Sequence, residues 1–505
     1  MTETKPNQMV PSRVRTYGGW REPRGWGLGT LTGAQSARVG GVLLVAFFMF
    51  PLGLGVGVLA LVVAAVLIAA TVVPFDNMTV SARITRGLRS IFARSSGAST
   101  FISGALTRHE RKHDLPGLLA PLVPLTTDDG RGGKQVLLWH RITGHLTAIL
   151  RVSPIGISLA DARDTDRWVA SYGSWLADLG YKPMVSSVAV TVDTAPTGGT
   201  TVADYVAGRI DPASAPLARQ ILGELVAATP TTASDVTTSV SVTFDPKKAS
   251  PAPPDLLAAT AEVTRWLPGI ESKLGSCGTS VLGRASTPWL IRRLRTAFDP
   301  MARGEAARTM ATTVGATVTG DATDVLRWED GGPVTAEDDW DHYRHDTGFS
   351  VSWALDEAPR QEVTSRVLVP LMSPGVFPRR VTLLYRPFSA GDAAKLVERE
   401  IGGQSLRREW SKKTKRDETQ RDRDDAHRAR QAAQEEAQGA GLGLFTVWVT
   451  TTVTDKAMLP AAIADVEERA GQSKLRLRQC RGAQAAGFAA SLGVGIDPSV
   501  IAKLR

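Results

Sequence analysis

The sequence contains only two cysteines, Cys277 and Cys480, among 505 residues. Two thiols so far apart provide no disulfide framework and no cysteine-rich metal site. This scarcity agrees with a reducing environment for most of the chain, as in the cytoplasm.

Motifs for nucleotide binding and for nucleophilic catalysis are also lacking. The string nearest to a phosphate-binding loop, Gly130 to Lys134, has neither the leading glycine spacing nor the hydroxyl residue that binds Mg²⁺. No G-x-S-x-G elbow occurs, and Gly25, Gly27 and Gly29 do not complete a dinucleotide-binding fingerprint. The sequence therefore predicts neither an enzyme nor a bound cofactor.

Histidine is scarce as well, with seven residues, four of which lie in two clusters. His109, Glu110 and His113 fit H-E-x-x-H, in which two imidazoles hold zinc and the glutamate activates water. Two cations, Arg111 and Lys112, occupy the middle positions and oppose a bound dication, so no metal site is predicted there and a membrane-bound zinc peptidase is the weakest alternative. The second cluster, His342 and His345 in an acidic segment, is expected to be a solvated linker rather than a weak metal site.

What the sequence does contain is a long apolar run, Val39 to Val73, with no charge between Arg38 and Asp76. Since ~20 apolar residues span the ~30 Å hydrocarbon layer, a run of about 35 residues is long enough for two short spans. Helix breakers with turn chemistry lie near its middle, namely Pro51, Gly53 and Gly57. We therefore predict a two-helix transmembrane hairpin over residues 35–75. The spacing of Gly53 and Gly57 also fits close packing of membrane helices, but a bend is the simpler interpretation.

Basic residues flank this run on both sides and predict its orientation. They are Arg13, Arg15, Arg21, Arg24 and Arg38 before it, and Arg83, Arg86, Arg89 and Arg94 after it. Because positive residues near spans mark the cytoplasmic side, we expect a multi-pass protein of the cell (inner) membrane with both termini cytoplasmic. The first arm, Val39 to Phe50, is short, so either Arg38 snorkels to the headgroups or this arm is re-entrant.

The net charge of +9 also favours contact with the lipid bilayer. Arg83, Arg86 and Arg89 surround apolar residues at helical spacing, as in a basic helix that lies on a membrane surface. Tyr17, Trp20 and Trp26 precede the hairpin; the tryptophans fit interfacial anchors, and a docking motif for a partner is the alternative. Contact with nucleic acid, which also needs cationic surface, stays open, as does a homo-oligomer.

The rest of the chain alternates between strand and helix patterns, which predicts an α+β cytoplasmic body with alternating elements. Ser365 to Val369 is among the expected strands. The order strand, helix, strand occurs twice at similar spacing. The first copy is Val240 to Phe244, a helix through Trp266, and Ser280 to Leu282; the second is Phe445 to Thr452, Leu459 to Ala470, and Leu475 to Leu477. This echo indicates either a duplicated unit or the general rhythm of such folds. The expected parts are a tail (1–34), the hairpin (35–75), a basic juxtamembrane helix and linker (76–134), a first α/β domain (135–300), an irregular acidic connector (301–348), and a second α/β domain (349–505) with a charged helix (392–439).

Two regions resemble known conjugation proteins. Arg15 to Trp20, Arg24 to Gly29 and the hairpin resemble an actinobacterial family of conjugation-associated membrane proteins, related to the PrgI-type membrane subunits of Gram-positive type IV secretion systems. The carboxy-terminal half resembles the non-ATPase, amino-terminal domain of VirB-type conjugative ATPases. The matching pieces are Val381 to Tyr385, the charged helix, Phe445 to Thr450, Arg476 to Gln479 and Gly487 to Leu492.

The resemblance implies a membrane-anchored scaffold subunit of a conjugation (type IV secretion) apparatus. In the ATPase family the last matching piece leads into the motor domain, whereas this sequence ends at Arg505, so we expect the transfer ATPase to be a separate partner alongside other secretion-channel subunits. The alternative is a membrane subunit of a type VII-like secretion system, which pairs an amino-terminal hairpin with a cytoplasmic α/β domain.

Overall fold

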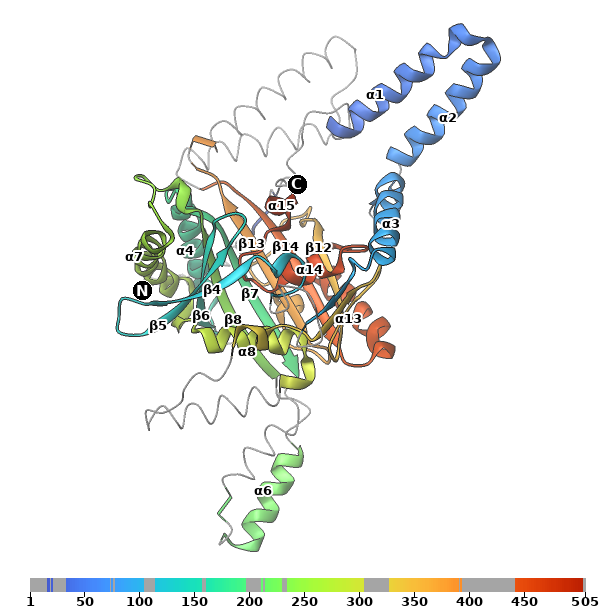
Figure 1. Ribbon diagram of the computed structural model, residues 1–505. Helices are drawn as coiled ribbons and strands as arrows, with labels where there is room; N and C mark the ends of the chain where they lie inside the picture. Colours follow the sequence, from blue (N-terminus) through green and yellow to red (C-terminus); the bar gives the residue numbers. More distant parts are fainter. Residues whose placement is uncertain are drawn as a thin grey trace, which may run out of the picture.

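The computed structural model describes residues 16–18, 20, 33–72, 74–75, 78–103, 114–156, 160–196, 210–211, 214–228, 234–303, 327–389, 391–392 and 441–502 (Figure 1). Its helices are α1 (Gly33–Phe48), α2 (Leu54–Val72), α3 (Val80–Ser95), α4 (Ala162–Gly180), α6 (Pro216–Ala228), α7 (Leu256–Leu274), α8 (Thr287–Phe298), α10 (Val369–Met372), α13 (Leu459–Gln472), α14 (Gln484–Ser491) and α15 (Pro498–Ile501). The predicted charged helix 392–439 lies outside the described residues apart from Asp392.

The strands complete the element order. They are β1 (Pro74–Phe75), β2 (Met78–Thr79), β3 (Thr100–Ile102), β4 (Leu122–Asp128), β5 (Lys134–His140), β6 (Leu146–Pro154), β7 (Val185–Pro196), β8 (Ser234–Phe244), β9 (Thr279–Arg284), β10 (Thr335–Asp338), β11 (Tyr343–His345), β12 (Gly348–Glu357), β13 (Arg379–Pro387), β14 (Gly443–Val453) and β15 (Arg476–Gln479).

Among the described residues, 13 strands form one antiparallel sheet. Its order is β3-β10-β11-β12-β14-β13-β7-β8-β6-β5-β4, with β15 paired to β12 and β9 paired to β6. The body is therefore mixed α+β, as the sequence predicts, although the alternation of strands and helices builds an antiparallel sheet rather than a parallel one.

Each half of this sheet repeats one topology. In the first half, β8 lies between β6 and β7 and is antiparallel to both, while β9 flanks the other side of β6. With α4 connecting β6 to β7 and α7 connecting β8 to β9, this is the βαββαβ arrangement called ferredoxin-like. In the second half, β12, α10, β13, β14, α13 and β15 follow in the same order, with the same pairings.

The internal echo in the sequence therefore has a structural counterpart, because β8-α7-β9 and β14-α13-β15 occupy equivalent places in the two units. The units join where β7 pairs with β13, in register from Val188 with Tyr385 to Thr194 with Arg379. Each predicted domain, 135–300 and 349–505, holds one unit, and the two units share a single sheet. The domain boundaries themselves stay predictions.

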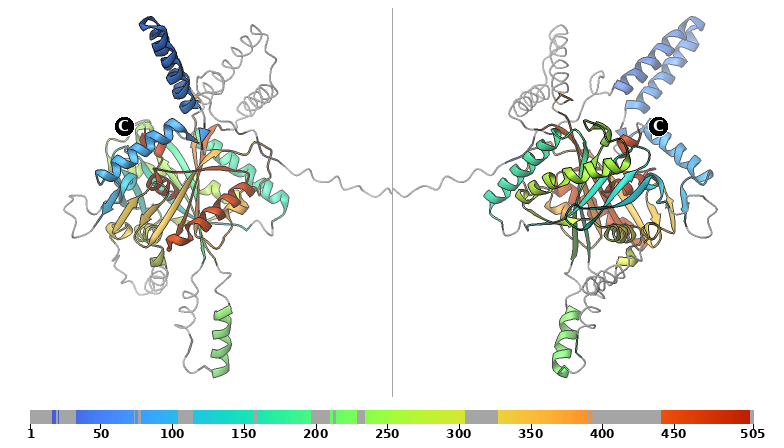
Figure 2. Two further views of the ribbon diagram at one scale, coloured as in Figure 1. Left: turned by 90° about the vertical axis from the view of Figure 1, so that its right-hand side faces the viewer. Right: turned by 60° about the vertical axis from the view of Figure 1, so that its left-hand side comes forward.

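Helices cover both faces of the sheet. On one face, α4 and α7 lie side by side on the first unit, and α13 packs on the second (Figures 1 and 2). Buried apolar residues such as Trp175, Val263 and Val466 form the core on this face. On the opposite face, α8 and α14 contribute to one cluster with Phe298 and Phe488 at its centre, and this cluster draws residues from both units.

A C-terminal strap, residues 484–497, crosses this second face. It begins in α14 over the second unit, where Thr382 Oγ1 donates a hydrogen bond to Ser491 O at 2.5 Å. It then passes so close to the first unit that a Cβ on Gly493 would overlap Thr191 and a Cβ on Gly495 would overlap Thr147. The strap thus connects the two units on the face away from α4 and α7.

The segment 335–345 is not the irregular connector that the sequence predicts for 301–348. It forms β10 and β11, which pair with each other and extend the sheet to β3. His342 and His345 are both buried, so the expectation of a solvated linker is also wrong. Apolar neighbours supplied by distant elements, Phe298 and Phe488, enclose His345, and the local sequence gives no sign of them.

Candidate membrane-anchoring surface

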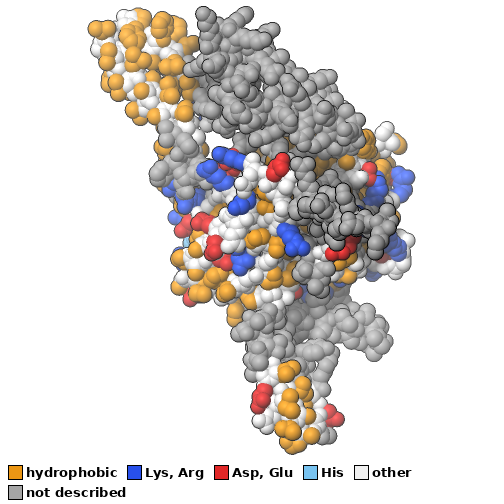
Figure 3. Space-filling view, turned by 180° about the vertical axis from the view of Figure 1, so that it is seen from behind, with side chains coloured by type: hydrophobic (Ala, Val, Ile, Leu, Met, Phe, Trp, Pro, Cys, Tyr) orange, Lys and Arg blue, Asp and Glu red, His pale blue; other side chains and the backbone are white. Residues whose placement is uncertain are grey.

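Two apolar helices, α1 and α2, project from the body as a hairpin (Figure 1). By length and composition, Gln35–Leu52 and Leu54–Val72 are candidates for crossing a membrane. Only 6% and 11% of these windows are buried, unlike the core helix of a soluble protein. On the face seen in Figure 3, hydrophobic side chains cover much of the hairpin and no charged side chain is visible on it.

The bend between the two helices depends on the glycines that the sequence analysis singles out. The short 3-10 helix η1 (Phe50–Leu52) contains Pro51, and Gly53 follows it with φ 130°, a conformation that other residues rarely adopt. Gly57 lies against the ring of Phe50: a Cβ there would come within 2.7 Å of Phe50 Cδ1. Gly53 therefore forms the bend, and Gly57, within α2, lets the ring of Phe50 pack closely against that helix.

At the end away from the bend, a side chain of α1 is hydrogen-bonded to the backbone of α2. Gln35 Nε2 donates a hydrogen bond to Thr71 O at 3.3 Å. Arg38 lies three residues further along α1 and is exposed. Arg38 thus lies near the base of the hairpin. From such a position on a spanning helix, a guanidinium can reach the lipid headgroups.

The aromatic residues before the hairpin have different places. Tyr17 forms a β-bridge with Val363, with both N–H···O distances at 2.8 Å, and its hydroxyl donates to Asp166 Oδ1 at 3.3 Å. Tyr17 therefore contacts the body, which the sequence pattern does not predict. Trp20 is half-buried, and Trp26 lies outside the described residues. Their anchoring roles stay predictions.

Helix α3 follows the hairpin and attaches to the body through its basic side. Thr79 caps its first turn by accepting a hydrogen bond from Ala82 N at 3.4 Å. Arg94 forms an ion pair with Asp339 in the turn between β10 and β11. Arg86 is half-buried, and burial together with the nearby Arg478 lowers its pKa below the usual value. Arg83 and Arg89, also predicted to anchor the protein, lie on the same helix.

The body residues that contact α3 are not among the anchoring residues that the sequence predicts. Asp339 belongs to the acidic run 337–341, whose charge alone points to no partner. Gly482 lies beside Arg86 and packs against Trp340. A glycine is required there because φ is 70° and a Cβ would come within 2.7 Å of Trp340. These contacts join segments about 250 to 400 residues apart in the chain, so local patterns give no signal for them.

The ring of the buried His345 is hydrogen-bonded on both sides within the body. The Nδ1–H of His345 donates to Phe298 O at 2.5 Å and Nε2 accepts from Ser350 Oγ at 2.7 Å, an assignment that follows because a carbonyl only accepts. Burial lowers the pKa of His345 to about 4, so the ring is neutral. Among the described residues, no group of three or more His, Cys, Asp or Glu could hold a metal ion. The H-E-x-x-H stretch 109–113 lies outside them.

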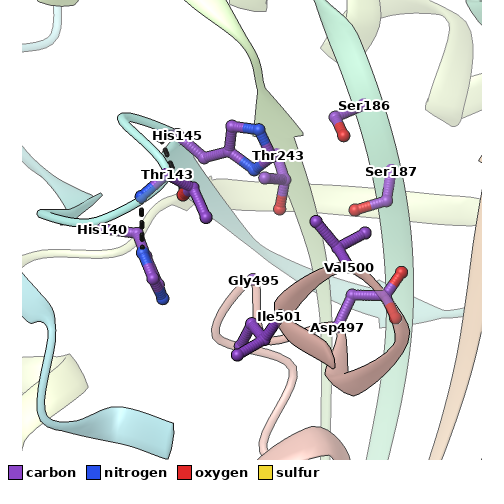
Figure 4. A pocket seen from close by; sticks show the side chains of 10 residues that line it. All are labelled: His140, Thr143, His145, Ser186, Ser187, Thr243, Gly495, Asp497, Val500 and Ile501. Atoms are coloured by element: carbon purple, nitrogen blue, oxygen red, sulfur yellow. Dashed lines mark hydrogen bonds between the residues drawn. The ribbon is translucent and has the colours of Figure 1, made fainter. Parts of the chain in front are cut away.

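One small pocket contains two further histidines, His140 and His145 (Figure 4). His140 Nδ1 accepts the backbone N–H of Thr143 at 3.2 Å, and Thr143 Oγ1 accepts the N–H of His145 at the same distance. Burial lowers the pKa of both rings. The His140 ring and the Thr143 hydroxyl thus stabilise the turn between β5 and β6. Among the described residues, no hydroxyl that lines the pocket donates to either ring, as a nucleophile–base pair requires.

Comparison with protein-family models and with curated proteins finds no match. The case for a function therefore depends on the geometry described above and on the resemblances in the sequence.

Proposed function

We propose that the protein is a membrane-anchored structural subunit of a bacterial conjugation (type IV secretion) apparatus, which docks a separate transfer ATPase at the inner membrane. The observation that carries the proposal is the apolar hairpin, α1 and α2, which stands out from the α+β body with its side chains exposed. In this proposal the hairpin crosses the bilayer twice and both chain termini are cytoplasmic.

The exposed surface of the hairpin is too apolar for water. From Leu43 to Val72, most large aliphatic and aromatic side chains are at least one third exposed, and α2 carries no charged residue. Soluble proteins rarely expose contiguous apolar patches of more than a few hundred Å². A hydrocarbon layer removes this surface from water, and both helices satisfy their own backbone hydrogen bonds, as spanning segments must.

The body offers the corresponding platform for a cytoplasmic partner. The stretches that resemble the non-ATPase domain of VirB-type ATPases are far apart in sequence, yet three of them pack together. Val381–Tyr385 lies in β13, which pairs with β14 at Phe445–Thr450, and α14 with Gly487–Ser491 packs across both strands. A resemblance spread over one packed unit supports a shared fold rather than scattered chance matches.

A subunit of a type VII-like secretion system is the second candidate, because a hairpin followed by a cytoplasmic α+β body is the layout of its membrane protein. The two candidates differ in what they assemble with. A conjugation subunit binds a transfer ATPase and channel proteins, whereas the type VII-like subunit belongs with an exporter of small helical proteins.

Affinity purification from solubilised membranes of the native host tests the proposal. We expect the tagged, cross-linked protein to retain a transfer ATPase together with channel subunits, and a tagged unrelated membrane protein of the same host to retain neither. Recovery of type VII components in their place would favour the second candidate. Recovery of no secretion component from well-expressed protein would contradict both.

A further inference from the structure

Helix α3 exposes the side that an ordinary surface helix would bury. Ile84, Leu88, Ile91 and Phe92 lie on one face at helical spacing and are 55%, 53%, 64% and 72% exposed. A helix that packs on a soluble body directs such a face to the core. The apolar face of α3 is therefore available to something other than the body.

The opposite side of α3 is the one that contacts the body. Arg86 and Ser90 on this side are half-buried, and Arg94 pairs with Asp339. These contacts hold the helix in a fixed rotation about its own axis. The apolar face is therefore directed outward by these contacts, and its exposure requires no rotation of α3 about its axis.

The position of α3 indicates what covers this face. It begins at Val80, shortly after α2 ends at Val72, and the two helices are in contact. Figure 2 shows α3 running across the direction of the hairpin, whereas α1 and α2 run along it. When α1 and α2 span the bilayer, a helix that runs across them beside the end of α2 lies in the plane of the membrane–water interface.

The charges on α3 complement an anionic surface. The helix has four arginines and no acidic residue. With ~100° between successive residues, the exposed Arg89 flanks the apolar face on one side, whereas the half-buried Arg83 falls between Arg94 and Ser90 on the side toward the body. The Arg89 guanidinium at this flank can reach lipid phosphates while the apolar residues enter the acyl region.

We propose that α3 is an in-plane interfacial helix that binds anionic phospholipids of the cytoplasmic leaflet. Its apolar face inserts between the lipids, Arg89 binds headgroup phosphates, and Arg86 with Arg94 keeps the body attached. The helix thereby fixes which side of the body faces the bilayer. This inference rests on the proposed anchoring by the hairpin.

Spin labels on the full chain in phospholipid vesicles test the insertion. In a background with Cys277→Ser and Cys480→Ala, single labels at Leu88→Cys on α3, Leu59→Cys on α2 and Leu257→Cys on α7 are compared. Leu257 is a matched control because it is a highly exposed leucine on a helix of the body. We expect the labels at 88 and 59 to collide mainly with oxygen, which partitions into lipid, and the label at 257 with a water-soluble nickel chelate.

The outcomes separate the two proposals. A label at 88 that behaves like the one at 257, while the label at 59 stays lipid-exposed, would overturn the role of α3 and leave the hairpin anchor standing. A label at 59 that is open to the chelate would overturn the anchor itself.

The lipid headgroup is tested by vesicle composition. We expect the label at 88 to move deeper when phosphatidylglycerol is mixed into phosphatidylcholine, and this shift to shrink markedly with Arg89→Gln. Arg163→Gln, at an exposed arginine of α4, is the matched control and should keep the shift. A shift of full size in the Arg89→Gln variant, or no shift in the unmodified helix, would overturn the assignment of Arg89 to anionic lipid.

Discussion

Replacing Gly495 by alanine is expected to destabilise the protein by about 2–5 kcal/mol. Gly495 has φ 80°, which costs an L-residue energy, and its added Cβ would overlap Thr147 Oγ1 and lie within 3.0 Å of Thr243 Oγ1. The two threonines are already hydrogen-bonded to each other at 3.0 Å on the sheet, so neither can move aside freely. Urea unfolding of the full-length protein in detergent, followed by tryptophan fluorescence, measures the loss.

Gly471→Ala serves as the control for this prediction. Gly471 lies in α13 without a positive φ, and a Cβ added there would meet no neighbouring atom within 4 Å, so alanine should leave stability unchanged or raise it slightly. Thr147→Ala combined with Gly495→Ala should recover part of the loss, because the overlapping hydroxyl is removed. Equal stability of the Gly495 and Gly471 variants would contradict the close contact between the strap and the sheet.

The second prediction concerns the pH dependence of stability, to which two buried groups contribute with opposite sign. Burial holds the pKa of His345 at about 4, below the ~6.5 of an unfolded chain. The unfolded state therefore binds the proton first, and the contribution of His345 is fully present above pH ~6.5 and is lost as the pH falls toward 4.

Asp338 acts the other way. Burial, with a smaller contribution from the neighbouring Asp339, raises the pKa of Asp338 to about 6, although its carboxylate accepts a hydrogen bond from Ala485 N at 3.0 Å. The folded state then binds the proton first, so its contribution increases as the pH falls from about 6 toward 4. Each group changes the free energy of unfolding by about 2–3 kcal/mol, so the two largely cancel in the unmodified protein.

Single variants should separate the two contributions. Between pH ~7 and ~4.5, Asp338→Asn should lose about 2–3 kcal/mol more stability than the unmodified protein, and His345→Gln should lose correspondingly less. Urea unfolding at the two pH values measures both differences, and the remaining carboxylates cancel in the comparison. Identical pH profiles for all three proteins would show that neither group titrates abnormally in the folded state.

The sequence predicts those parts of the structure that depend on local pattern. The run Val39 to Val73 has few alternatives to an apolar hairpin, and Gly53 marks the bend because only glycine adopts its φ readily. The expected helix Leu459 to Ala470 matches α13 to within a few residues, since its apolar face has helical spacing. In contrast, the expectation of a strand at Ser365 to Val369 is wrong, because α10 begins at Val369 with Pro370 in its first turn.

Contacts between distant segments lie beyond such patterns. The pairing of β7 with β13 joins two edge strands almost 200 residues apart, and nothing in either strand specifies its partner. For α3, the amphipathic pattern identifies both faces but not which one contacts the body. That choice depends on Asp339 and Gly482, which the chain brings to α3 only in the folded state.

The membrane-crossing hairpin is the central claim, and cysteine labelling at its tip tests it most directly. In the cysteine-free background, Leu52→Cys lies in η1 between the two helices and Leu257→Cys lies on the body. We predict that a membrane-impermeant maleimide added to right-side-out membrane vesicles labels position 52 at once and position 257 only after permeabilisation. Protection of position 52 until the membrane is opened would contradict a hairpin that crosses the bilayer.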